Sequence, residues 1–410
     1  MTLDYDVLIV GGGMVGASLA RAISGQGLNI GVLEAFEYHS DDQPSYDDRV
    51  LALSWGSHLI LQTMGLWSSL NSEAEPILDV HISDRGHFGF TRLNHKEEGV
   101  GALGYVITAR ALGEVLLKGL GDAPDIDLIC PAALQSLKMN ESGVEVNLLA
   151  EGQQRTVSTK LLVAADGGDS QVRTLLSMPV KETTYGQTAI IANVTPEQAH
   201  RGVAYERFTD SGPLALLPMT QERCSLVWTA KDEQAPELMA LDDENFLARL
   251  QDRFGYRMGR LLKVGKRVAY PLRMRQAMEQ VRPHVALIGN ASHTVHPVTG
   301  QGLNLGIRDV AVLADVLADV ASSNGANGDP GDLANLQRYA DWRQQDQNRV
   351  VMITDTLARL FANPLTPLRL MRNLGLLGVD VTPGLKHLAA NQFMGLNGRL
   401  PRLARGVPIV

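Results

Sequence analysis

The sequence predicts an α/β fold in which a mostly parallel sheet is interrupted by an inserted antiparallel sheet and followed by a C-terminal helical segment. Short apolar strands run into glycine-rich turns at three distant places, after residues 10, 165 and 288. Residues 188–252 alternate strand signals with polar loops, which is typical of an antiparallel sheet. A chain of 410 residues is long enough for two or three such units.

The first of these turns joins a strand at 7–10 to a helix at 17–24. Three glycines in the turn have separate purposes. Gly11 lets the chain turn sharply, Gly13 lets the backbone approach a pyrophosphate, and Gly16 lets the helix lie close to the strand. The start of such a helix attracts phosphates because its backbone N–H groups are unpaired.

The acidic residue that completes this motif follows the next strand. Residues 29–33 form a second apolar run, and Glu34 comes directly after it, where its carboxylate can accept hydrogen bonds from a ribose diol. The same glycine spacing recurs at 99–104, but the charged residues 95–98 before it cannot form a buried strand. We therefore predict one Rossmann-like dinucleotide-binding domain, built on the first motif alone.

Two further apolar strands end in turns of the same kind. Residues 160–165 lead to Asp166 and Gly167, and residues 285–288 lead to Gly289 and Asn290. The carboxyl ends of parallel strands meet at one edge of a sheet, so we expect the three turns to share a site. The chain then passes through a glycine-rich stretch that opens a helix and contains His296, Pro297, Gly300, Gln301, Gly302, Leu303 and Asn304.

These returns to strand-and-turn patterns imply a discontinuous first domain. We expect residues 1–75, 100–180 and 284–350 in the dinucleotide-binding domain, 76–99 and 181–283 in a substrate domain, and 351–410 in a basic, helical C-terminal segment. Arg49 follows a polar loop and precedes the apolar run 50–54. It could lie over the cofactor or start a helix, and the pattern leaves both open.

Composition excludes several classes of function. A net charge of −8 argues against general nucleic-acid binding. The two cysteines, Cys130 and Cys224, are too far apart for a redox CxxC pair and lack zinc-site spacing, so we expect no metal. The N-terminus lacks a basic secretory region, and no apolar run reaches the length of a membrane span. We expect a cytoplasmic protein.

In their order along the chain, the motifs at Glu34, Asp166-Gly167 and Gly289-Asn290 resemble those of the flavin-dependent aromatic hydroxylases of the p-hydroxybenzoate hydroxylase type. Together they cover most of the chain. Four further stretches resemble the ubiquinone-biosynthesis branch, most closely its 2-polyprenyl-6-methoxyphenol hydroxylases, and these are residues 83–87, 204–209, 212–215 and 223–228. Asn290 replaces the aspartate usual in the wider family, and its amide oxygen can still accept a hydrogen bond from the flavin.

The resemblance implies noncovalent FAD, NAD(P)H as a transient electron donor and O₂ as co-substrate. The implied reaction is hydroxylation of a polyprenyl methoxyphenol ring in ubiquinone biosynthesis, through a flavin hydroperoxide. The implied cofactor-binding residues are Gly11, Gly13, Gly16, Glu34, Arg49, Asp166, Gly167, Gly289, Asn290, Pro297, Gly300, Gln301, Gly302, Leu303 and Asn304. His296, Pro297 and Arg49 are the candidates for catalysis, although His296 could equally stabilise its turn.

The last part of the chain is basic and rich in leucine. After residue 355 a single acid, Asp380, accompanies Arg359, Arg369, Arg372, Lys386, Arg399, Arg402 and Arg405. Such a segment could lie on an anionic membrane, which would give the protein a peripheral position on the inner membrane face. It could equally pack on the acidic body of the protein or on a second subunit in a homo-oligomer.

Two other functions stay open at this point. One is a flavin monooxygenase for another aromatic or lipid substrate, and the other is an FAD-fold scaffold that binds other ubiquinone-biosynthesis proteins. The sequence leaves undetermined the ring position that is hydroxylated, the prenyl chain length, the choice between NADH and NADPH, and the oligomeric state.

Overall fold

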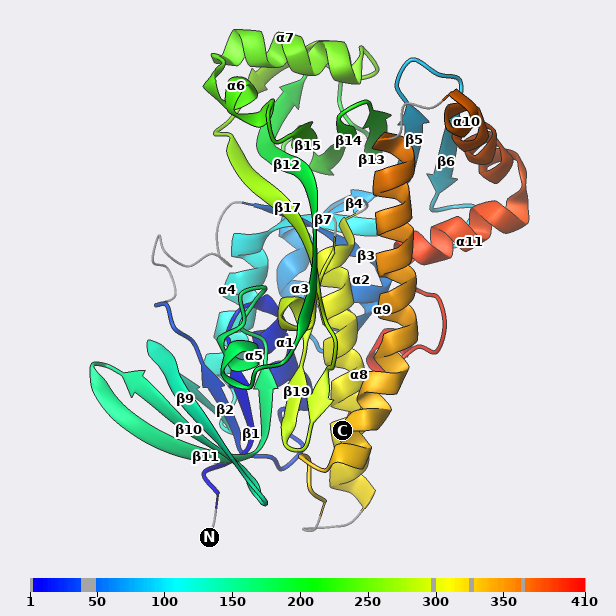
Figure 1. Ribbon diagram of the computed structural model, residues 1–410. Helices are drawn as coiled ribbons and strands as arrows, with labels where there is room; N and C mark the ends of the chain where they lie inside the picture. Colours follow the sequence, from blue (N-terminus) through cyan, green and yellow to red (C-terminus); the bar gives the residue numbers. More distant parts are fainter. Residues whose placement is uncertain (1–2, 38–48, 296–299, 324–327, 363–365, 410) are drawn as a thin grey trace.

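Three β-sheets organise the computed structural model, which describes residues 3–37, 49–295, 300–323, 328–362 and 366–409 (Figure 1). An eight-stranded sheet forms one end of the molecule, a nine-stranded sheet forms the other, and a three-stranded sheet is the smallest. The predicted combination of a parallel sheet with an inserted, mainly antiparallel sheet is confirmed. The domain boundaries remain a prediction.

The first sheet has a parallel centre. Strand β1 pairs in parallel with β2 and β11, β11 with β19, and β2 with β8. Its strands are β1 (Tyr5–Val10), β2 (Ile30–Leu33), β8 (Ile126–Ile129), β9 (Ala132–Asn140), β10 (Gly143–Ala150), β11 (Gln153–Ala164), β18 (Val281–Arg282) and β19 (Val285–Leu287). Strands β9 to β11 form the expected antiparallel meander.

Both faces of the β1 strand are buried, because successive side chains of a strand point to opposite faces. Val7 and Ile9 pack in the core that contains α1 (Met14–Ile23), α4 (Ala109–Gly121) and α8 (Gln301–Ser323). Leu8 and Val10 pack on the other side, against the meander. The short helix α5 (Gln171–Leu175) follows β11.

The second sheet is antiparallel except for the parallel pair β5–β13. Its strands are β5 (Asp79–Asp84), β6 (Phe90–Asn94), β12 (Val180–Pro196), β13 (Val203–Thr209), β14 (Gly212–Met219), β15 (Arg223–Lys231), β16 (Leu261–Val264), β17 (Val268–Ala277) and β20 (His293–Thr294). Helices α6 (Ala235–Ala240) and α7 (Asp243–Phe254) cover one face, α6 through Leu238 and α7 through Phe246, Leu250 and Phe254. The long strands β12 and β17 run between the two ends of the molecule (Figure 1).

The third sheet consists of β3 (Val50–Ser54), β4 (Glu75–Ile77) and β7 (Gly104–Thr108). Arg49 directly precedes β3, so the alternative that it starts a helix is wrong. The helix begins later, because Ser54 Oγ accepts a hydrogen bond from the Ser57 backbone N–H and caps it. The elements that follow are α2 (Trp55–Thr63), α3 (Trp67–Leu70) and the 3₁₀ turn η1 (Asn71–Glu73).

Helices form the rest of the chain. Helix α9 (Leu333–Ala362) packs along α8 and reaches the second sheet, where α10 (Thr366–Val381) packs on β6 and α11 (Pro383–Met394) follows it. The 3₁₀ turn η5 (Leu403–Arg405) then packs against α2. Among the described residues, no helix combines the length and apolar character needed to cross a membrane.

Several cations of the C-terminal segment turn towards the body of the protein. Arg372 Nε lies 2.8 Å from Asp84 Oδ2, Lys386 Nζ lies 2.8 Å from Glu97 Oε2, and Arg402 Nε lies 2.9 Å from Asp315 Oδ1. These ion pairs support the expectation that the segment packs on the acidic body, since they leave these charges engaged within the chain.

Candidate functional site

The three predicted turns lie side by side where β1, β11 and β19 end. Gly11 has φ +103°, and a Cβ built on it would lie 2.5 Å from the Ala165 carbonyl oxygen. Gly289 has φ +57°, and its Cβ would lie 3.0 Å from Cγ1 of Val15 in α1. A larger residue at either position would separate the turns, so glycine lets them meet.

Glu34 directly follows β2, beside the first turn. Its Oε2 accepts a hydrogen bond from the Gly12 backbone N–H at 2.8 Å, and its Oε1 accepts one from the Phe36 N–H at 3.0 Å. A carboxylate oxygen has more than one acceptor site, so the side chain can still accept a ribose hydroxyl. Gly16 lies close to the first turn, since its Cβ would lie 1.9 Å from the Gly11 carbonyl oxygen.

The remaining turn residues differ in what they contribute. Gly13 precedes α1 as its N-cap, and Asp166 Oδ2 accepts a hydrogen bond from the Val172 N–H at 3.0 Å, which fixes the second turn to α5. A Cβ on Gly167 would meet no atom within 4 Å, and Asn290 is exposed in the 3₁₀ turn η2 (Gly289–Ala291). These two positions therefore face open space.

Helix α8 begins at the third glycine-rich stretch. A Cβ on Gly302 would meet no atom within 4 Å, so the first turn of α8 also faces open space. Gln301 Nε2 donates to the Phe393 carbonyl oxygen at 3.3 Å, Leu303 packs at the edge of the core, and Gly300 approaches Ala52. His296 and Pro297 lie outside the described residues.

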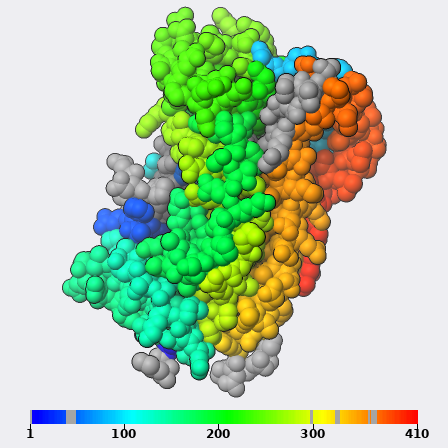
Figure 2. Space-filling model, viewed as in Figure 1, coloured from blue at the N-terminus to red at the C-terminus, as the bar shows by residue number. Residues whose placement is uncertain are grey.

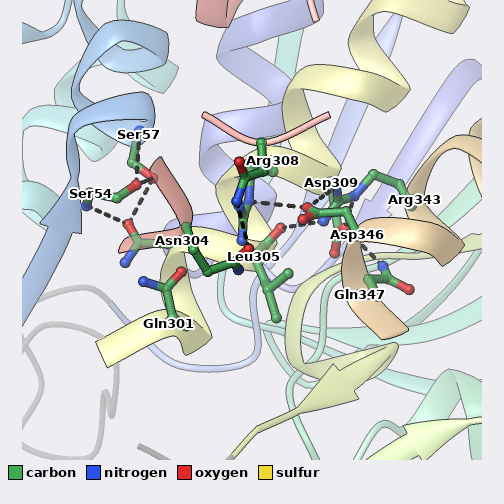
Figure 3. Close-up of polar contacts among 12 residues, drawn as sticks. Ser54, Ser57, Gln301, Asn304, Leu305, Arg308, Asp309, Arg343, Asp346 and Gln347 are labelled. Atoms are coloured by element: carbon green, nitrogen blue, oxygen red, sulfur yellow. Dashed lines mark hydrogen bonds and ion pairs between the residues drawn. The ribbon is translucent and has the colours of Figure 1, made fainter. Parts of the chain in front are cut away.

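The Asn304 side chain forms its hydrogen bonds within the protein (Figure 3). Its Oδ1 accepts hydrogen bonds from the Ser54 N–H and the Ser57 Oγ, both at 2.8 Å. Its Nδ2 donates to the Ala52 and Gly300 carbonyl oxygens, also at 2.8 Å. The Asn304 side chain therefore ties α8 to β3 and α2, and a contact of its backbone with the cofactor stays a prediction.

A buried carboxylate that we did not predict holds the third turn in place. Asp309 Oδ2 accepts hydrogen bonds from the Gly289 N–H at 2.9 Å and from His293 Nε2 at 2.8 Å. Its Oδ1 accepts from Arg343 Nε at 2.6 Å and from Gln347 Nε2 at 3.0 Å. Burial acts to raise the pKa of Asp309, but the interactions with His293 and Arg343 outweigh it and hold that pKa well below its usual range.

A cavity of about 340 Å³ lies between the Gly300 turn and the uncovered face of the second sheet. Phe393 of α11 contributes to its wall, as do Arg49 and Tyr270, whose ring centroid lies 5.6 Å from the Arg49 guanidinium carbon. The wall is mostly apolar and includes Ile77, Val80, Ala189, Ile191, Ala204, Pro213, Ala215, Leu217, Val227, Leu272 and Val295.

One carboxylate, Glu206, interrupts this apolar wall. Among the described residues that line the cavity, no other is acidic. Its neighbours across the sheet are Ala215 and Ile82, and burial raises the pKa of Glu206 to about 7. The side chain is partly accessible because it faces the cavity. We did not predict it, since an acid in an otherwise ordinary strand carries no local signal.

Residues 4–353 match the FAD binding domain family. The chain is 40% identical over 407 residues to the ubiquinone hydroxylase UbiL of Rhodospirillum rubrum, covering 98% of this chain and 93% of that one. It is 32% identical over 397 residues to the 3-demethoxyubiquinol 3-hydroxylase of Escherichia coli, covering 95% and 98%. The p-nitrophenol 4-monooxygenase PnpA of Pseudomonas putida has a similar fold, with a TM-score of 0.79 at 18% identity, covering 97% of this chain and 100% of that one.

Replacing Asp309 by asparagine should lower the free energy of unfolding by about 3–5 kcal/mol, because the buried Arg343 and His293 would both lose an anionic partner. Urea denaturation of the purified variant measures this change. Asp252→Asn is the matched control, since Asp252 pairs with Arg85 at the exposed surface and should contribute about 1 kcal/mol or less. Equal effects of the two substitutions would show that Asp309 is not the central contact inferred above.

Proposed function

The chain belongs to the FAD binding domain family, as one of its flavin-dependent hydroxylases, and we propose that it hydroxylates the ring of a polyprenyl-substituted phenol in ubiquinone biosynthesis. NAD(P)H would supply the electrons and O₂ the oxygen atom. Relatives named for ubiquinone hydroxylation match nearly the whole chain. The observation that carries the proposal is the apolar cavity that opens between the Gly300 turn and the second sheet.

The residues at the three turns fit an FAD. Open space lies in front of Gly167 and Gly302, where a cofactor can approach the backbone closely. The first N–H groups of α1 and α8 have no partner within their helices, so they can receive a phosphate and the electron-rich end of a flavin. Glu34 would bind the ribose. When bound, FAD supplies the redox and oxygen chemistry that side chains lack.

The apolar wall would position the ring and exclude water. A buried apolar site is needed because access of water would promote loss of the activated oxygen before it reaches the ring. Tyr270 and Phe393 provide aromatic surface against which a ring can pack, and Arg49 adds a positive charge at the same wall. Arg49 is thus proposed to favour the ionised, more electron-rich phenol.

Glu206 is proposed to accept the phenol proton. An ionised phenol attacks an electrophilic oxygen more readily than a neutral phenol does, so a base in this cavity would assist the reaction. A carboxylate with a pKa of about 7 is a stronger base than an exposed glutamate and is still half ionised at neutral pH. Glu206 lines the cavity, so its carboxylate would lie beside a ring bound there.

A polyprenyl tail would need apolar surface beyond this cavity, and α10 and α11 offer it. Their outer face exposes Leu370, Met371, Leu374, Val381, Leu385 and Leu388, each at least 48% exposed. The inner face of α11 carries Phe393, so this helix separates the cavity from the outside. We propose that the outer face rests on a membrane surface, from which the substrate enters. Figure 2 shows the two helices at one edge of the molecule.

A purified, FAD-loaded protein should oxidise NADH or NADPH faster when a short-chain prenyl phenol is added, and one atom of ¹⁸O₂ should appear in the product. Oxidation rate and product mass measure these two effects. Yellow protein without any turnover would instead support a scaffold, and equal efficiency with an untailed phenol would indicate another aromatic substrate.

Replacing Glu206 by glutamine should lower kcat/KM at pH 8 by about 100-fold, because the base is lost. In the unmodified protein kcat/KM should rise with pH through about 7, and this rise should be absent from Glu206→Gln. Because the pKa of Glu206 is raised in the folded state, its ionisation destabilises the folded protein as the pH increases. The Glu206→Gln variant should therefore gain thermal stability relative to the unmodified protein between pH 5 and 8.

The control for Glu206→Gln is Glu114→Gln, since Glu114 is exposed on α4. It should change neither the pH profile nor the thermal stability by a measurable amount. A Glu206→Gln variant that keeps its FAD absorbance and the original pH profile would exclude Glu206 as the base.

The double variant Leu374→Gln and Leu388→Gln should bind anionic phospholipid vesicles about tenfold more weakly, since it removes apolar surface from α10 and α11. Vesicle flotation measures the binding. Leu262→Gln, which changes an exposed leucine of β16, should leave it unchanged. Undiminished flotation of the double variant would contradict the membrane contact, and a loss of dimers in light scattering would assign the face to a second subunit.

A further inference from the structure

Strand β17 extends from the wall of the proposed substrate cavity to the turns of the proposed flavin site. Tyr270 and Leu272 line the cavity, and Arg275 lies three residues beyond Leu272 on the same strand, about 10 Å further along. Backbone pairs with β12 hold the strand from Val268 to Ala277. Secondary-structure elements held in this way can carry energetic coupling between two sites, so β17 links the cavity to the turns.

The third turn is joined to the end of β17 through the backbone. Arg275 pairs with Thr294 in the antiparallel ladder of β17 and β20, and the Ala277 N–H donates to the Ser292 carbonyl oxygen at 2.8 Å. Thr294 also lines the substrate cavity. Because backbone groups make these contacts, the third turn is attached to β17 independently of the Arg275 side chain.

The second turn is joined to β17 through that side chain. Nη1 of Arg275 donates to the Gly168 carbonyl oxygen at 3.1 Å and also pairs with Asp169. Its Nε donates to Oε2 of Glu182, on β12, at 2.8 Å. The N–H groups of a guanidinium point in fixed directions, so these three acceptors together set its position. Arg275 therefore holds the second turn at a defined place beside the second sheet.

A second guanidinium meets the same carbonyl oxygen. Arg173, which is buried on α5, donates from Nη2 to the Gly168 carbonyl oxygen and from Nη1 to the Ala291 carbonyl oxygen, both at 2.7 Å. Ala291 belongs to the third turn, so Arg173 joins the second turn to the third while Arg275 joins the second turn to β17. The flavin turns and the sheet that bears the cavity thus meet at the Gly168 carbonyl oxygen.

We propose that Arg275 is a positioning residue that sets the second turn for FAD and couples FAD binding to ligand binding in the substrate cavity. It acts through the turn, because Gly168 follows Gly167, whose backbone faces the open space where FAD would bind. A ring packed against Tyr270 and Leu272 would restrict β17, so less order has to be gained when FAD binds. The coupling rests on the proposed function, whereas the positioning of the turn does not.

The first test measures FAD binding by the full-length protein without substrate. Arg275→Gln should raise the Kd for FAD about tenfold or more, because a charge-assisted hydrogen bond to the turn is lost. The Kd follows from the FAD released when the holoprotein is diluted, and far-UV circular dichroism at saturating FAD checks the fold. Arg275→Lys keeps the charge without the fork, so it should recover part of the affinity, and it preserves the test if the glutamine variant does not fold.

Two controls separate the carbonyl contact from the ion pairs. Asp169→Asn removes the partner that is 92% exposed, and it should raise the Kd for FAD less than about twofold, since the contact with Gly168 remains. Arg253→Gln removes a guanidinium of similar exposure, 21% against 18% for Arg275, which pairs with Asp210 far from the turns. It should leave the Kd unchanged. Equal Kd values for folded Arg275→Gln and Arg253→Gln, or an equal loss in Asp169→Asn, would overturn the proposed contact.

The second test adds the short-chain prenyl phenol without NAD(P)H, so that no turnover occurs. Saturating phenol should lower the Kd for FAD about fivefold or more in the unmodified protein, and less than about twofold in Arg275→Gln. Calorimetry with the holoprotein shows whether the phenol binds. A phenol that binds without changing the Kd for FAD, or an unchanged factor in Arg275→Gln, would overturn the coupling. Should the phenol fail to bind the unmodified protein, the proposed function fails, and the first test still decides whether Arg275 positions the turn.

Discussion

One buried carboxylate, Asp309, connects the turn at the carboxyl end of β19 to the helices behind the first sheet. It receives the backbone N–H of Gly289, the ring of His293 and the side chains of Arg343 and Gln347. A buried charge is tolerated only where partners compensate for its lost hydration, and here those partners come from the third turn and from α9. The position of that turn, and with it the proposed flavin site, depends on this contact.

The proposed substrate cavity follows from the alternation of side chains in the second sheet. Ile190, Leu216 and Trp228 point to the face that α6 and α7 cover. Their neighbours Ile191, Ala215 and Val227 point to the opposite face, where the wall of the cavity forms. A sheet that is apolar on both faces needs two covers, and a bound apolar ring can serve as part of the second. Glu206 is the exception, and it gives this wall the carboxylate that we propose as the proton acceptor.

The C-terminal segment separates charge from apolar surface. Arg372, Lys386 and Arg402 form ion pairs with carboxylates of the body, so they attach the segment to the rest of the chain. Leucines then dominate the outer faces of α10 and α11. In the sequence, the basic residues and the leucines are mixed along one stretch. The fold sorts them to opposite sides, so the paired charges face the body of the protein and the apolar side chains face outward.

The sequence alone determined the strands, the three glycine-rich turns and the family, because these depend on local rules. Glycine at position 11 permits a left-handed turn, and alternation or helical spacing defines an element from its own residues. The tertiary structure alone decided that the Asn304 side chain ties α8 to β3 and α2, that Arg49 precedes a strand, that Asp309 and Arg308 are buried, and that Glu206 lines a cavity. The properties of these charged and polar groups depend on partners and on local dielectric, and distant parts of the chain supply both only after folding.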